Sequence, residues 1–129
     1  MKRLPFILLF IFSLQFTLSH AQELGGTLTV WLKAGNSHEI AKNFDKRVDI
    51  TINENADNYS SEQAEMILKD FLSKFSFRDF TVMHKGTSPD NAQYIIGTMK
   101  TNSGTFRTYI FIKKSGDTNL IQEIRFEKE

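Results

Sequence analysis

The stretch SSEQAEMILKDFLSKF, residues 60–75, contains the best-specified element of the chain and decides its fold. Ser60 and Gln63 have the spacing of a capping box, in which each side chain bonds to the other residue's backbone N–H at the start of a helix. After them, apolar residues recur every three or four positions, as on one face of a helix. They are Ala64, Ile67, Leu68, Phe71, Leu72 and Phe75. The pattern predicts a helix from Ser61 to Lys74.

Four strands are predicted after this helix, because apolar and polar residues alternate there between short turns. They span Phe80–Gly86, Ala92–Thr101, Thr105–Lys114 and Leu120–Glu127. Gly, Asn, Asp, Ser and Pro residues fill the intervening turns. Connections this short join antiparallel neighbours, so the four strands should form a meander of hairpins.

Two helices and one strand are predicted before the helix at Ser61–Lys74. Gly35-Asn36 ends a first helix, whose apolar side carries Leu24, Leu28, Trp31 and Leu32. A short second helix follows, and then a strand over Val48–Ile52. We interpret residues 54–58, ENADN, as a polar loop. The order α-α-β-α-β-β-β-β is typical of the α+β class, with the helices covering one face of a mostly antiparallel sheet.

Several short pieces of the chain carry a resemblance to a known family. They are Gly35-Asn36, Tyr59-Ser60, Gln63-Ala64-Glu65, Lys69-Asp70-Phe71, His84-x-Gly86, Tyr94-x-Ile96-Gly97, Gly104-Thr105-Phe106-Arg107 and residues 121–125, IQEIR. With the element order, they resemble the DUF4783 family of small secreted bacterial proteins. The resemblance implies a cone of the nuclear-transport-factor-2-like (NTF2-like, cystatin-like) type and export from the cell. It implies no activity.

The first residues have the pattern of a secretory signal peptide. Lys2 and Arg3 precede an apolar run over Leu4–Leu18, and Ser19-His20-Ala21 is a small-x-small cleavage site. We expect cleavage after Ala21, a single domain over residues 22–129, and location in the periplasm or outside the cell. The alternative, a membrane anchor, is disfavoured because the apolar run is shorter than the about 20 residues of a stable span. No membrane association is expected after the signal is removed.

Charge and cysteine content exclude several classes of function. Cleavage removes two of the 16 basic residues and none of the 15 acidic ones, which leaves a net charge of −1. A near-neutral domain has no electrostatic surface for nucleic acid. The chain has no cysteine, so thiol nucleophiles, thiolate metal sites and disulfides are impossible. We also expect no metal and no cofactor, because His38 and His84 are the only histidines outside the leader and neither has the spacing of a metal motif.

Polar residues on the face assigned to the helices raise the question of a ligand pocket. Alternation places His84 there with Phe80 and Val82. No carboxylate shares that predicted face, so His84 lacks the orienting group of a catalytic histidine, and we expect a structural histidine bonded within the core. The alternative is an enzyme or a pocket for a small apolar ligand in the cone. Its candidate lining is Trp31, Tyr59, His84, Tyr94, Thr108 and Gln122.

The opposite face of the predicted sheet carries an apolar band with charges around it. The candidate interface residues are Met83, Ile95, Met99, Arg107, Tyr109, Phe111 and Ile121. A contiguous apolar patch rimmed by charge is typical of an interface. We therefore expect a non-enzymatic binding or scaffold domain that forms a homodimer, or binds another protein, through this face.

Overall fold

The computed structural model describes residues 20–75 and 77–129. Its elements are α1 (His20–Ala34), α2 (Ser37–Ala41), β1 (Phe44–Ile52), β2 (Asn55–Ser60), α3 (Ser61–Lys74), β3 (Phe77–Thr87), β4 (Ala92–Thr101), β5 (Gly104–Ser115) and β6 (Thr118–Lys128). The predicted leader lies, up to residue 19, outside the described residues. The described part confirms the α+β class.

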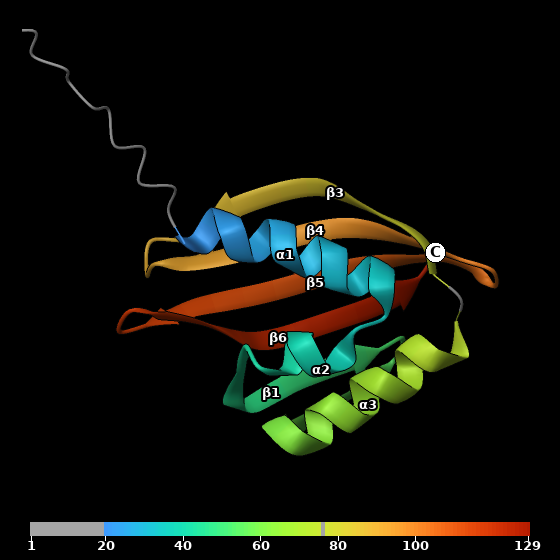
Figure 1. Cartoon of the computed structure of the whole chain (residues 1–129), viewed down its shortest axis with the longest axis horizontal. Coiled ribbons are helices and arrows are strands. Elements are labelled where there is room, and N and C mark those ends of the chain that lie inside the picture. The colour runs from blue at the N-terminus through green and yellow to red at the C-terminus, as the bar shows by residue number, and fades with distance from the viewer. Residues whose placement is uncertain (1–19, 76) are drawn as a thin grey trace, which may run out of the picture.

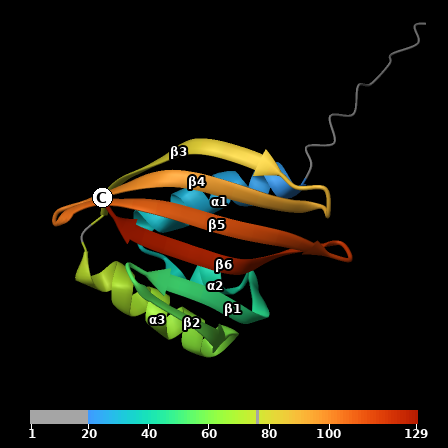
Figure 2. The same cartoon turned by 180° about the vertical axis from the view of Figure 1, so that it is seen from behind.

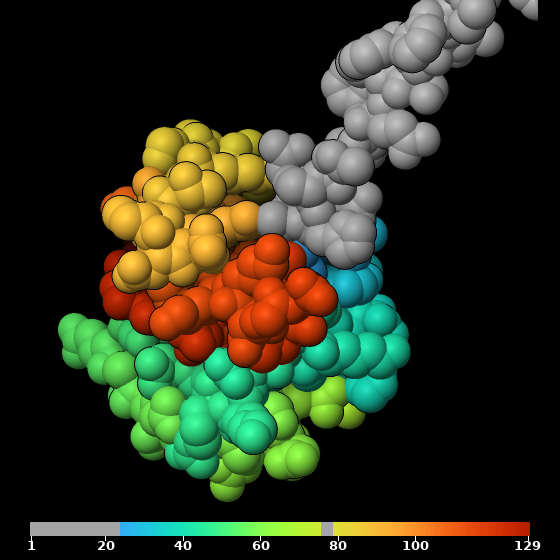
Figure 3. All heavy atoms as spheres, turned by 90° about the vertical axis from the view of Figure 1, so that its left-hand side faces the viewer, coloured from blue at the N-terminus to red at the C-terminus, as the bar shows by residue number. Residues whose placement is uncertain are grey.

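Six strands form one curved sheet in the order β2-β1-β6-β5-β4-β3. All neighbours are antiparallel except β1 and β6, which are parallel. The three helices lie over one face of the sheet, called here the inner face (Figure 1). Turning the molecule around shows the opposite, outer face with no described helix in front of it (Figure 2). The turns between β3 and β4 and between β5 and β6 lie at the same end of the molecule (Figure 3).

The helix predicted from residues 60–75 is confirmed as α3. The Ser60 hydroxyl accepts a hydrogen bond of 3.3 Å from the Gln63 N–H at its start. Phe71 stacks on Phe126 at 4.3 Å between ring centroids and meets the edge of Phe106 at 5.3 Å. These rings join α3 to β5 and β6, where the core of the domain lies.

The loop predicted for residues 54–58 is wrong, because most of it belongs to strand β2. Ile52 pairs with Asn55 across a tight turn, and Asn53 takes a positive φ of 55° there. Such two-residue hairpin turns favour asparagine and glycine. Most side chains of β2 are exposed, since the strand lies at the edge of the sheet. An edge strand without apolar alternation has no periodic signal in the sequence.

Two β-bulges overturn part of the predicted assignment of faces. Val82 pairs with Gly97 but His84 pairs with Ile96, so Met83 is an extra residue in β3. A slip of one residue moves each later side chain to the other face. His84 therefore lies on the outer face and is exposed, and its predicted place in the core is wrong. A second register shift between β5 and β6 leaves Ile121 in the core, with both residues after it half-buried.

Strand β4 has the opposite orientation to the predicted one. Ile95, Gly97 and Met99 are buried under the helices, whereas Tyr94 and Ile96 are half-buried on the outer face. The alternation was ambiguous here because three large residues are consecutive in this strand. Gly97 faces the core beside Phe80. Only glycine fits there, since a Cβ at this position would lie 2.5 Å from Cζ of Phe80.

Candidate functional site

A block of four large side chains occupies the outer face of the two strands β4 and β5. Tyr94 pairs with Phe111, and Ile96 pairs with Tyr109. All four are half-buried although no described helix covers this face. Directly paired residues on one face of a sheet are in side-chain contact, so the four form a contiguous apolar surface. We call it the outer-face block.

Tyr94 is held in place from the β3 side by His84 and Gly86. The His84 Nε2 and the Tyr94 hydroxyl share a hydrogen bond of 3.1 Å. Gly86 pairs with Tyr94, and a Cβ at residue 86 would lie only 2.2 Å from Cζ of that ring. The Tyr94 side chain therefore lies across the bare backbone of Gly86. The bulge at Met83 is what brings residues 84 and 86 to the same face as Tyr94.

Tyr109 is bordered by charged groups on the β6 side. The Arg125 guanidinium carbon lies 5.1 Å from the centroid of the Tyr109 ring, within the range of a cation–π contact. The Arg125 Nε donates a hydrogen bond to the Glu123 carboxylate. Burial, followed by the Glu123 charge, raises the pKa of the Tyr109 phenol above its ordinary value. The near-parallel rings of Tyr94 and Tyr109 have their centroids 6.4 Å apart. A continuous row of contacting side chains therefore runs across the outer face from His84 on β3 to Arg125 on β6.

The predicted cone pocket is not formed by the residues assigned to it. Trp31 is half-buried against the core on α1, and Thr108 is fully buried on β5. Gln122 donates a hydrogen bond of 3.0 Å to Asp45 Oδ2, and this bond is the main reason why the pKa of Asp45 is lowered. His84 and Tyr94 lie on the outer face of the sheet, away from the helices and from the predicted pocket.

The predicted interface is corrected at three positions. Ile95, Met99 and Ile121 are at most 5% exposed and belong to the core. Arg107, Tyr109 and Phe111 lie on the outer face, with Tyr109 and Phe111 in the block. Met83, the bulge residue, is 67% exposed. Tyr94 was predicted to line the pocket and not the interface, and Ile96 was in neither candidate set; the signal was the run Tyr94-Ile95-Ile96, which makes both faces of β4 apolar.

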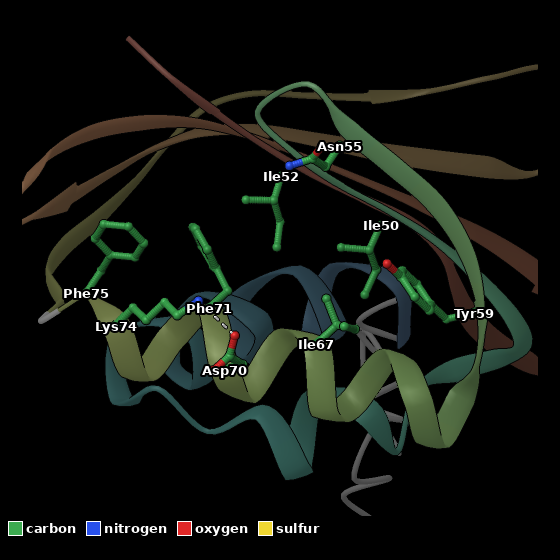
Figure 4. Close-up of a pocket in the computed structure, with 9 residues that line it drawn as sticks. All are labelled: Ile50, Ile52, Asn55, Tyr59, Ile67, Asp70, Phe71, Lys74 and Phe75. Atoms are coloured by element: carbon green, nitrogen blue, oxygen red, sulfur yellow. Dashed lines mark ion pairs between the residues drawn. The ribbon is translucent and has the colours of Figure 1, made fainter.

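A pocket of about 340 Å³ lies elsewhere, between α3 and the hairpin of β1 and β2 (Figure 4). Apolar side chains form most of its lining: Ile50, Ile52, Ile67, Phe71 and Phe75. Asn55, Tyr59, Asp70 and Lys74 complete it. Tyr59 is the one residue of the predicted pocket that lines it.

The described part of the chain contains neither a metal-binding cluster nor a membrane-spanning helix. Residues 20–75 and 77–129 contain no group of three or more His, Asp or Glu side chains arranged to hold a metal ion. His38 contacts Glu65 Oε1 through Nδ1 at 2.6 Å on the surface of α2 and α3. None of the described helices is long and apolar enough to cross a membrane.

Comparison with known proteins identifies the family. The model of the domain of unknown function DUF4783 matches residues 27–127. The chain belongs to the DUF4783 family. No curated protein matches it.

Solved structures agree with this assignment. A DUF4783 protein from Bacteroides fragilis is 30% identical with a TM-score of 0.75, and the match covers 79% of this chain and 95% of that one. One from Bacteroides uniformis is 29% identical with the same TM-score, over 79% of this chain and 94% of that one. An NTF2-like protein of unknown function from Cytophaga hutchinsonii, 12% identical, has a TM-score of 0.59 over 84% of this chain and 88% of that one. At that identity the likeness shows the fold alone, and this DUF4783 domain has the NTF2-like fold.

Proposed function

We propose that this DUF4783 domain is a secreted, non-enzymatic binding domain that associates with a second copy of itself through the outer face of its sheet. The outer-face block carries the proposal. Tyr94, Ile96, Tyr109 and Phe111 form a contiguous apolar surface that no described element covers. Large aromatic side chains at the centre of a patch are typical anchors of protein interfaces.

The charges around the block favour a second copy as the partner. Arg107 and Arg125 lie on the outer face together with the carboxylates of Asp49, Glu123 and Glu127. A two-fold axis pairs a surface with itself, and a surface of one charge sign would repel its copy. A surface carrying both signs can instead place opposite charges against each other across the axis.

The test is sedimentation velocity of the purified domain over a range of concentrations. The wild type should form a dimer, and Phe111→Glu should remain a monomer, because it places an unpaired charge at the centre of the buried surface. Met66→Glu is the matched control, since Met66 is 70% exposed on α3, and this variant should dimerise like the wild type. Circular dichroism checks that all three are folded. A wild type that stays monomeric at high concentration, or a dimer unaffected by Phe111→Glu, would refute the proposal.

Secretion rests on the pattern of residues 1–21 and has its own test. Exported protein should begin at Gln22, because Ser19-His20-Ala21 has the small residues that the cleavage site requires. Mass spectrometry of the protein from the periplasm or medium measures the N-terminus. Protein that retains Met1 and stays in the cytoplasm would contradict the proposed location and leave the dimer proposal untouched.

A further inference from the structure

We propose that the pocket between α3 and the β1–β2 hairpin binds an uncharged, mostly apolar small molecule that carries one hydrogen-bonding group. The pocket is formed by the inner side of the hairpin and one side of α3, and its volume of about 340 Å³ is at the lower end of the range of ligand sites. The proposal is independent of dimerisation through the outer face, because the two sites are on opposite sides of the sheet.

The apolar lining of the pocket is only partly covered by the rest of the protein. Ile50 and Phe71 form a buried floor. Ile52, Ile67 and Phe75 are half-buried and pack against the core while also facing the pocket (Figure 4). Three large apolar side chains, from α3 and from the hairpin, thus expose part of their surface inside the same pocket. An apolar ligand would remove that surface from water, at roughly 25 cal/mol per Å².

Two polar side chains in the pocket are available to orient such a ligand. The Tyr59 hydroxyl is directed toward the pocket, next to Ile50, and has no hydrogen-bond partner within the described part of the chain (Figure 4). Asn55 stands at the turn side of the pocket, and its amide group likewise has no partner among the described residues. A few polar groups in an otherwise apolar lining are typical of ligand sites, where they fix orientation.

The charges of the lining indicate that the ligand is neutral. Lys74 Nζ lies 3.1 Å from Asp70 Oδ2, one turn earlier on the same helix. Each of these side chains is 65% exposed, so the pair lies at the rim in contact with water. The two charges compensate each other, and the lining has no further charged group. An ionic ligand would have to break this pair or lie beside a group of its own sign.

The experiment compares two fluorescent probes that share one skeleton. N-phenyl-1-naphthylamine is neutral, apolar and has a single N–H donor, whereas 8-anilino-1-naphthalenesulfonate adds a negative charge. Each is titrated into the folded mature domain. The neutral probe should bind with one site per chain and at least tenfold more tightly than the sulfonate.

Three variants locate the binding site. Ile67→Trp fills the pocket from α3 and should weaken binding of the neutral probe at least tenfold. Met66→Trp adds the same side chain at the neighbouring exposed position and should leave binding unchanged. Tyr59→Phe keeps the ring and removes the hydroxyl, and should weaken binding about three- to tenfold. Absence of binding by folded wild type, tighter binding of the sulfonate, or equal binding by Ile67→Trp and Met66→Trp would each overturn the proposal.

Discussion

Replacing Thr108 with valine should raise the free energy of unfolding of this domain. Thr108 is fully buried on β5, between Gly97 of β4 and Phe126 of β6. Its hydroxyl is the one buried side-chain polar atom without a hydrogen-bond partner in the described residues. A buried polar group without a partner costs about 1–3 kcal/mol. Valine has nearly the same shape and replaces the hydroxyl by a methyl group, so we expect a gain of about 1–2 kcal/mol.

Urea unfolding followed by Trp31 fluorescence measures this gain, since Trp31 is packed against the same core. For a domain of this size, each kcal/mol corresponds to roughly 4–8 °C in the midpoint of thermal unfolding. Two controls separate the hydroxyl from other effects. Thr108→Ser keeps the hydroxyl and deletes a buried methyl group, and should lose about 1 kcal/mol. Thr98→Val makes the same change on the outer face and should stay within about 0.5 kcal/mol of the wild type.

A lower stability of Thr108→Val would refute this reasoning. It would mean that the hydroxyl is satisfied in solution, for example by a buried water molecule, and that the valine leaves that partner unpaired. An equal gain from Thr98→Val would also refute it, because the gain would then come from strand propensity and not from burial.

Two further predictions concern Gly97 and Asp45. Gly97→Ala should destabilise the domain by more than about 1 kcal/mol, since its Cβ would lie 2.5 Å from Cζ of Phe80 and 2.9 Å from the backbone oxygen of Thr81. Gly26→Ala in α1 should be neutral or stabilising, because its Cβ would contact no described residue beyond its own stretch of helix. Equal urea midpoints for the two variants would contradict this. The hydrogen bond from Gln122 lowers the pKa of Asp45 below its ordinary value of 3.8, so this stabilisation is present above the pKa of the unfolded chain and is lost as the pH falls through the folded value. The difference in free energy of unfolding between wild type and Gln122→Met should therefore be largest near about pH 6 and shrink toward about pH 2; a difference independent of pH would show that Gln122 acts through packing alone.

The elements with strong local signals were predictable from sequence. The N-cap of α3 is a local contact and its apolar stripe repeats with the helical period, so both can be read from the sequence, and the short turns after residue 87 admit only hairpins. The positions of the two bulges were not predictable. Val82-Met83-His84 reads as regular alternation, and the extra residue becomes visible only in the pairing with Gly97 and Ile96. The side of the sheet on which His84 lies thus depends on a non-local interaction. The residues of the predicted pocket and of the predicted interface depend on it too, because they were assigned by face.

Strand β2 and the pocket beside it were missed for a related reason. The strand lies at the edge of the sheet and most of its side chains are exposed, so it shows no alternation of polar and apolar residues. Only its pairing with β1 defines it. Tyr59 was predicted to line a different pocket, whereas Ile67 was placed in the apolar stripe of the helix and Ile52 at the end of a strand. Their meeting around one pocket depends on the hairpin that the sequence pattern did not reveal.

The position of β6 in the sheet has a consequence for how the chain acquires its structure. The last strand, Thr118–Lys128, is inserted between β1 and β5, so the hairpin of β1 and β2 reaches the rest of the sheet only through it. During synthesis, everything before residue 118 can form at most two separate sheets, one of two strands and one of three. Contacts between strands so distant in sequence form slowly, because a long loop must close first. A ribosome-bound chain therefore keeps these two sheets apart, with part of their apolar inner faces exposed to water, until β6 emerges and joins them.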